Sequence, residues 1–169
     1  MEPQKQRTAY SKITKRYINK AKRYCDIKRS LEERDILTFK NMYYENMDRV
    51  KAKKSYYFTE EYFLDIIKLK DFEIEVIYAT LKETGQIISG AIMMKKNKVI
   101  HYHLSGTLTE YMHLNPLRLI LDEARAHGSM ETYDFMNLGG GLGGSADSLF
   151  QFKSTFSKDL KKFKIWKYI

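Results

Sequence analysis

Residues 137–156 read NLGGGLGGSADSLFQFKSTF, and this segment leads from a glycine-rich loop into a helix. The residues before the loop, Thr132 to Leu138, alternate apolar and polar side chains and are predicted to form a strand. Five of the next six residues are glycine, so the backbone can turn sharply there and a substrate can approach its N–H groups closely. Either Ser145 or Asp147 is then expected to cap a helix.

The predicted helix carries one apolar face and one cation. Leu149, Phe152 and Phe156 recur at helical spacing and form that face. Lys153 lies about a quarter-turn away from it, and we expect its side chain to point towards the mouth of the glycine loop. A strand, a bare loop, a helix start and a cation in this order favour a site that holds a negative charge or a polar carbonyl group.

The composition of the 169 residues, with 43% hydrophobic and 30% charged side chains, is typical of a globular protein. This length predicts one domain with a sizeable core, or one domain with an appendage. No apolar run approaches the roughly 18 residues that span a bilayer, and the polar, basic start predicts no signal peptide. The single Cys25 predicts no internal disulfide and fits a reducing cytoplasm.

The net charge of +9 is unevenly distributed along the chain. Residues 1–30 hold ten lysines and arginines against Glu2 and Asp26, and five more lysines cluster between Lys158 and Lys167. Such segments favour a polyanionic partner, which could be nucleic acid, the phosphate groups of a ligand or, through peripheral contact, an acidic membrane surface. A solvated helix face that only confers solubility remains open as the alternative.

The first part of the chain predicts helices on either side of one short strand. Apolar spacing and capping residues indicate a basic helix from Ser11 to Tyr24, a strand from Cys25 to Arg29, a helix that a Ser30–Glu33 capping box opens and whose apolar face reaches Val50, and a helix capped by Thr59.

The middle of the chain changes to the period of strands. Alternation and tight turns predict an antiparallel meander of three strands, Phe72–Lys82, Ile87–Lys95 and Val99–Ser105. Asn115 and Pro116 then open a helix that is expected to end at Gly128. A last strand, Phe163–Ile169, follows the helix after the glycine loop. Strands followed by a β-α-β unit predict an α+β fold with a mixed, mostly antiparallel sheet flanked by helices.

This order of elements is similar to the GNAT acyltransferase fold, and several motifs resemble one family within it. The motifs are YHLSG at 102–106, NLGGG at 137–141 and DSLFQFK at 147–153. Together they resemble the C-terminal, GNAT-type half of the Fem (FemABX) family, the peptidoglycan-bridge aminoacyltransferases. KRYINKA at 15–21 and YYENM at 43–47 resemble the segments that lead into that half, so the likeness covers most of the chain.

The resemblance implies a cytoplasmic enzyme of cell-wall synthesis that moves an amino acid from aminoacyl-tRNA to an amine of a peptidoglycan precursor, with no further cofactor and no metal. The family's Phe-Lys position, here Phe152-Lys153, is implicated in catalysis or tRNA engagement. We expect Lys153 to stabilise charge on the carbonyl oxygen, and His103 is a candidate general base. The acyl site is expected to include Tyr102, Ser105, Asn137, Gly139, Gly140, Gly141 and Phe152, and the tRNA is expected to contact Lys15, Arg16, Lys20 and Arg23.

Members of the Fem family carry two GNAT-like halves. Much of the precursor binding, together with a catalytic acid, belongs to the half that has no counterpart in this sequence. The chain is therefore either part of a larger enzyme or acts alone on a smaller substrate, and a lone half could recover a partner as a homodimer. Within the chain we divide a basic N-terminal helical segment, 1–29, from a GNAT-like acyltransferase domain, 30–169.

Two other functions remain open. An acyl-CoA-dependent GNAT N-acyltransferase of an amino sugar or small amine would cradle pyrophosphate on a glycine-rich turn after the third strand of the meander. The corresponding turn, 106–111, has one glycine and one acid, which weighs against coenzyme A. A non-catalytic RNA-binding module would use the basic N-terminal helix and its interleaved Tyr10, Tyr17 and Tyr24.

Two further kinds of site are discounted. Gly139, Gly141 and Gly144 match the dinucleotide motif G-x-G-x-x-G, but too little chain follows them for the rest of a doubly wound sheet. His101 and His103 are expected on one strand face, yet no neighbouring carboxylate or cysteine completes a metal site.

Overall fold

A computed structural model describes residues 3–141 and 145–161 of the chain. Its centre is a five-stranded sheet with the strands in sequence order. The first four strands pair antiparallel, and the fifth pairs parallel to the fourth. The predicted α+β fold with a mixed sheet is therefore confirmed. The strands are β1 (Cys25–Arg29), β2 (Glu73–Leu81), β3 (Ile87–Lys96), β4 (Val99–Thr107) and β5 (Phe135–Asn137).

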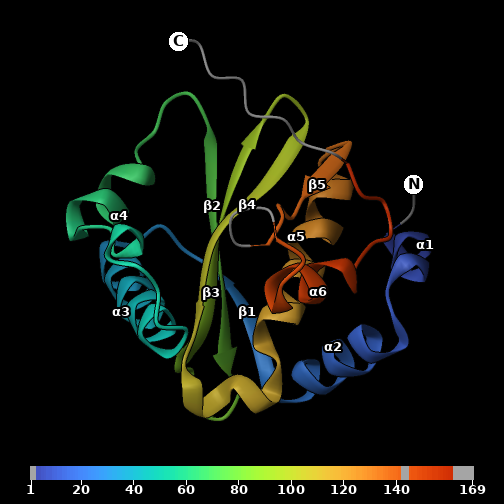
Figure 1. Cartoon of the computed structure of the whole chain (residues 1–169), viewed down its shortest axis with the longest axis horizontal. Helices are drawn as coiled ribbons and strands as arrows, with labels where there is room; N and C mark the ends of the chain where they lie inside the picture. The colour runs from blue at the N-terminus through green and yellow to red at the C-terminus, as the bar shows by residue number, and fades with distance from the viewer. Residues whose placement is uncertain (1–2, 142–144, 162–169) are drawn as a thin grey trace.

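Helices cover both faces of the sheet (Figure 1). One face is packed by α3 (Glu33–Arg49) and α4 (Glu60–Ile66), and the other by α2 (Lys12–Tyr24) and α5 (Pro116–Met130). The shorter α6 (Ser148–Ser154) lies beside α5. The remaining elements are short: α1 (Pro3–Gln6) and the 3-10 turns Arg7–Ala9, Lys54–Tyr56 and Thr109–Leu114.

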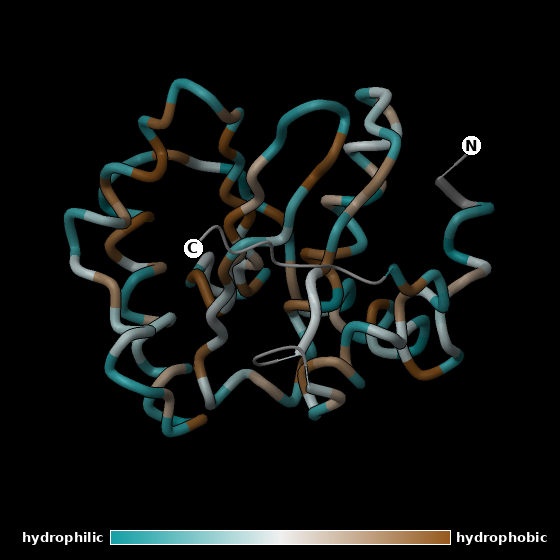
Figure 2. The backbone as a smooth tube through the Cα atoms, turned by 45° about the horizontal axis from the view of Figure 1, so that its top comes forward, coloured by the Kyte–Doolittle hydropathy of each residue, from teal (hydrophilic) through white to brown (hydrophobic). Residues whose placement is uncertain are grey.

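Strand alternation divides the core into two layers. Ile77 and Ala79 of β2 face the layer with α2 and α5, whereas Val76 and Tyr78 face the layer with α3 and α4. The outer turns of the helices are mostly hydrophilic, and hydrophobic stretches run through the interior (Figure 2). Within the described part of the chain, no helix is both long and apolar enough to cross a membrane.

The basic N-terminal helix is part of this core. Ser11 caps α2 by accepting a hydrogen bond from the Thr14 N–H, and Ile18 and Ala21 are completely buried. β1 follows α2 directly and pairs with β2. The segments on the two sides of the proposed division between residues 29 and 30 therefore share one sheet. The division itself stays a prediction.

Two predicted helix boundaries are wrong. The Ser30–Glu33 capping box does not form, because the chain stays extended through Glu32 and α3 begins at Glu33 without a side-chain cap. The Ser30 hydroxyl accepts instead from the Glu32 N–H at 3.2 Å. At its other end α3 stops at Arg49, so Val50 lies beyond the helix and is 59% exposed rather than part of the apolar face.

Gly128 does not end α5, which continues to Met130. A Cβ atom at Gly128 would lie 2.1 Å from Cδ1 of Ile100, so the glycine allows α5 to approach β4 closely. β5 is also shorter than the predicted strand from Thr132, because Thr132 adopts a left-handed φ of 67°. The predicted strand Phe163–Ile169 lies outside the described residues.

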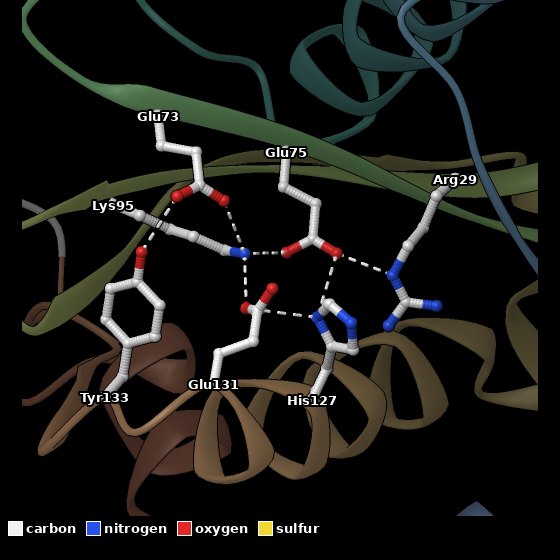
Figure 3. A network of polar contacts seen from close by, with 7 residues as sticks. All are labelled: Arg29, Glu73, Glu75, Lys95, His127, Glu131 and Tyr133. Atoms are coloured by element: carbon white, nitrogen blue, oxygen red, sulfur yellow. Dashed lines mark hydrogen bonds and ion pairs between the residues drawn. The ribbon is translucent and has the colours of Figure 1, made fainter.

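A buried lysine joins β2, β3 and the end of α5 (Figure 3). The side chain of Lys95 is 2% exposed, and its Nζ lies 3.1 Å from Glu73, 3.0 Å from Glu75 and 2.9 Å from Glu131. Burial alone would lower the pKa of Lys95, but hydrogen bonds to the three carboxylates outweigh it and raise that pKa. Three more side chains extend the network from its edges: Arg29, His127 and Tyr133.

Replacing the buried cation should be costly. Lys95→Met is expected to lower the free energy of unfolding by about 3 kcal/mol at neutral pH, because three clustered carboxylates would lose the cation they share and only Glu75 would keep its arginine partner. The pKa of Glu73 is lowered by its hydrogen bond to Lys95. This carboxylate therefore stabilises the wild type above the usual glutamate pKa and loses that contribution as pH falls through the folded pKa.

The difference between variant and wild type should accordingly shrink on acidification. Urea unfolding at neutral and at acidic pH measures it. The matched control is Lys96→Met at the exposed neighbouring position, with an expected change of at most about 0.5 kcal/mol. A loss in Lys95→Met no larger than in the control would show that the network contributes nothing.

Candidate functional site

The site begins where β4 loses its partner strand. β4 pairs with β5 only from Val99 to His101. After Asn137 the chain turns, because the Asn137 side-chain oxygen accepts a hydrogen bond from the Gly139 N–H at 2.8 Å and Gly139 takes a left-handed φ of 70°. In the described part of the chain, the second half of β4 therefore has no strand neighbour on this side.

A cleft of about 700 Å³ lies over this unpaired half of β4. Tyr102 to Ser105 and Thr107 form its floor. One wall is the end of α3 with the segment that follows it, and the other is the start of α5 with α6. Five of the residues expected at the site line this cleft: Tyr102, His103, Ser105, Phe152 and Lys153.

Lys153 points towards the glycine loop, as its spacing in α6 predicts. Its Nζ donates to the Gly140 carbonyl at 2.9 Å and lies 5.3 Å from the centre of the Tyr102 ring. Asp147 caps α6 by accepting from the Phe150 N–H at 2.9 Å. Burial lowers the pKa of Lys153, and the nearby Asp147 opposes that shift.

His103 lies on the floor of the cleft beside α4. Its Nε2 is 2.6 Å from the Tyr62 hydroxyl, and the tautomer decides which group donates. Burial lowers the pKa of His103, and the neighbouring His101 adds to the effect. The imidazole is therefore neutral at pH 7 and can accept a proton.

Two other floor residues bond each other. The hydroxyl groups of Tyr102 and Ser105 form a short hydrogen bond. Burial raises the pKa of Tyr102 to about 12, although the bond to Ser105 opposes it, so the phenol remains protonated. Lys153 lies over the Tyr102 ring, so this hydroxyl pair belongs to the part of the floor next to the lysine.

Arg118, in the first turn of α5, is a buried cation that fixes α6. Its Nη1 donates to the hydroxyls of Thr14 in α2 and Thr155 after α6, both at 2.7 Å. The guanidinium also lies 4.6 Å from the centre of the Phe152 ring. No carboxylate among the described residues pairs with it, and burial lowers its pKa. Arg118 thus joins three helices next to Lys153.

The glycine loop lies beside the cleft rather than along its walls. Gly140 reaches the site through its carbonyl and Lys153, whereas Asn137, Gly139 and Gly141 are not among the lining residues. A Cβ atom at Gly141 would lie 2.1 Å from the Ser145 carbonyl oxygen, so this glycine is needed for a close backbone contact.

The cations expected to bind tRNA lie on α2 outside the cleft. Lys20 donates to the His113 carbonyl at 2.8 Å, and Arg16 packs over the ring of Tyr17. Neither these residues nor Lys15 and Arg23 line the cleft. The role of these four residues in binding nucleic acid stays a prediction.

Three parts of this site were not predicted from the sequence. These are Tyr62 beside His103, Arg118 beside Phe152, and the basic run from Arg49 to Lys54. Only that run has a signal in the sequence, which is four cations within six residues at the end of a helix. In residues 3–141 and 145–161, no group of three or more histidine, cysteine, aspartate and glutamate side chains could hold a metal ion.

The imidazole of His103 should titrate below the ordinary histidine pKa of about 6.5, because burial disfavours its charged form. NMR titration of the histidine ring protons measures this, with His103→Gln assigning the resonance. A midpoint at or above the ordinary value would contradict the described environment of the ring.

Removing one hydroxyl should loosen α6. Thr155→Val keeps the β-branched shape but removes the hydroxyl that accepts from Arg118 and Thr14 and donates to the Phe152 carbonyl. We expect it to lower the free energy of unfolding by about 1–2 kcal/mol. Hydrogen exchange should accelerate in α6 and remain unchanged in β2 and β3. Thr38→Val is the matched control, because the Thr38 hydroxyl bonds only a carbonyl of its own helix. Equal exchange of α6 in both variants would refute the role of the hydroxyl junction that Arg118, Thr14 and Thr155 form.

The chain is similar to known proteins in sequence and in fold. Residues 8–154 match a family model described as an acetyltransferase (GNAT) domain. No curated protein matches the sequence. Among solved structures, FemX is similar with a TM-score of 0.75 at 14% identity, over 92% of this chain. This chain spans 56% of the length of FemX.

Two smaller proteins are matched over nearly their whole length. An aminoglycoside acetyltransferase from an uncultured soil metagenomic sample has a TM-score of 0.62 at 13% identity, over 88% of this chain and 97% of its own. A possible acetyltransferase from Clostridium difficile 630 has a TM-score of 0.64 at 8% identity, over 86% and 99%. At these identities the likeness shows the fold, and the family model identifies the chain as a member of the acetyltransferase (GNAT) domain family.

Proposed function

We propose that this protein transfers an amino acid from aminoacyl-tRNA to an amine of a peptidoglycan precursor. The observation that carries the proposal is the placement of Lys153 in the cleft, between the Gly140 carbonyl and the Tyr102 ring. The motif around Lys153 resembles that of the Fem family, and the FemX fold is similar over most of this chain.

The chemistry of the transfer needs a base and a stabilised oxyanion. The amine nitrogen attacks the carbonyl carbon of the aminoacyl ester, and the carbonyl oxygen becomes negatively charged. Lys153 would stabilise that charge with its ammonium group. Collapse of the intermediate forms the amide and breaks the ester C–O bond, and the leaving ribose oxygen takes up, by way of His103, the proton that the nitrogen loses. His103, neutral at pH 7, would accept the proton that the attacking nitrogen loses.

The second candidate is an acyl-CoA-dependent N-acyltransfer to an amino sugar or small amine. It is favoured by the match to an aminoglycoside acetyltransferase over 97% of that chain. The end of β4 is evidence against this candidate, because Gly106 allows α3 to pack closely and does not form a loop that could bind the pyrophosphate of coenzyme A. A Cβ atom there would lie 2.7 Å from the Tyr43 backbone nitrogen in α3. The tRNA donor is therefore our first choice.

The proposal also places the protein in the cytoplasm, with tRNA and a cell-wall precursor as its partners. Because this chain spans 56% of the length of FemX, a second domain or subunit would hold part of the precursor. This could be a further domain of the same protein, the partner in a homodimer or another protein.

The first test is binding and transfer with Lys153→Ala. Purified protein should bind aminoacyl-tRNA rather than acetyl-CoA, and should transfer a labelled amino acid to a soluble peptidoglycan precursor. Lys153→Ala should lower kcat by about 100-fold or more with little change in KM, as expected for a group that acts in the transition state. Lys158→Ala, an exposed lysine beyond α6, is the matched control and should stay within twofold.

Three results would contradict the proposed function or the proposed role of Lys153. Tight binding of acetyl-CoA without tRNA binding would support the N-acyltransferase. Binding of tRNA without transfer to any amine would support a non-catalytic RNA-binding module. Equal kcat for Lys153→Ala and the control would remove Lys153 from the chemistry.

A further inference from the structure

The segment between α3 and α4 forms one wall of the cleft. Residues 49–57 read RVKAKKSYY, which is four cations and two tyrosines with no acidic residue. Arg49 to Lys53 and Tyr56 line the cleft, whereas Lys54 lies outside it and is exposed. The positive charge therefore continues from the interior of the cleft to the surface of the protein. We call residues 49–57 the basic wall.

The basic wall is held in one conformation by bonds to the core. The Tyr43 hydroxyl, in a buried side chain of α3, donates to the Tyr56 carbonyl at 2.8 Å. The Ala52 N–H donates to the Met47 carbonyl at 2.9 Å. Arg49 donates to the Thr107 carbonyl at the end of β4 at 3.2 Å. The backbone that carries the cations is thus already ordered, so little backbone entropy is lost on binding.

The lysines of the basic wall keep their charge available. Lys51, Lys53 and Lys54 are exposed and form no ion pair with any residue in 3–141 or 145–161. Several cations of the N-terminal region are instead neutralised by carboxylates. These ion pairs are Arg7 and Lys22 with Asp122, Lys28 with Asp35, and Arg29 with Glu75.

The opposite wall of the cleft adds to this potential. Arg118 and Lys153 face the cleft there, and Asp147 is the carboxylate among the described lining residues. Apolar groups lie between the cations: Tyr56 is 36% exposed, Met112 46% and Leu149 40%. A positive groove with exposed aromatic and apolar side chains is the arrangement that binds single-stranded nucleic acid, through phosphate contacts and base stacking.

From this arrangement we infer that the basic wall binds the single-stranded acceptor end of the RNA donor and guides it into the cleft. The inference rests on the proposed aminoacyl-tRNA donor and assigns its binding surface to residues 49–57 rather than to α2. Phosphates would contact Lys51, Lys53 and Lys54, and a base would stack on Tyr56. The terminal ester would then lie between the basic wall and Lys153.

The test measures binding of an RNA hairpin with a single-stranded 3′ end as a function of salt. The wall variant is Lys51→Asn, Lys53→Gln and Lys54→Gln, where asparagine suits the left-handed φ of 51° at residue 51. Its slope of log affinity against log salt should fall by roughly 2, since each phosphate contact of a single strand contributes about 0.7. Tyr56→Ala should weaken binding about fivefold or more through lost stacking.

A matched control removes the same charge elsewhere. Lys70→Gln, Lys96→Gln and Lys98→Asn are exposed positions near the β2 start and the β3–β4 turn, and residue 98 also has a left-handed φ of 60°. This control should retain the slope of the wild type. A blunt hairpin without the 3′ tail should lose the difference between the wild type and Tyr56→Ala.

The outcomes separate this inference from the proposed function. A wild type that does not bind the hairpin overturns the RNA donor and the basic wall together. A wild type that binds, with an unchanged slope in the wall variant, overturns the basic wall alone. A rival variant in α2, Lys15→Gln with Lys20→Gln and Arg23→Gln, that loses as much slope as the wall variant would also refute the assignment to residues 49–57.

Discussion

β4 pairs with β3 over nearly its whole length but with β5 only over Val99–His101, and the site depends on this mismatch. A fully paired β4 would continue the sheet and leave no space on that side. Because the chain turns at Asn137 and Gly139, the strand residues from Tyr102 onward face a cleft instead. The backbone of β4 stays anchored by β3, so the floor of the cleft is rigid while its edge is open.

The walls of the cleft come from helices that the sheet alone does not position. Arg118 connects α5 with Thr14 of α2 and with Thr155 after α6, and its buried guanidinium packs on Phe152. A short helix such as α6 has little stability of its own, so its position follows from these contacts. The placement of Lys153 is therefore a consequence of tertiary bonds made two residues further along the chain.

Charge has two separate uses in this protein. Lys95 and the N-terminal cations that pair with Asp122, Asp35 and Glu75 are neutralised inside the fold. The cations around the cleft largely lack such partners among the described residues, which is why we propose them as contacts for a negatively charged ligand. Counting charges along the chain cannot separate these two uses. The use of each cation depends on whether an acidic side chain folds against it.

Local pattern was enough to predict the meander, the helices and the α+β fold, because strand alternation, helical spacing and capping act between near neighbours. It also placed Lys153 towards the glycine loop, since a helix fixes the direction of each side chain. It failed at Ser30 and Gly128, where contacts across the fold outweigh local preference. The pairing of His103 with Tyr62 and the Arg118 contacts join residues far apart in the sequence. Such contacts exist only once the sheet brings the helices together.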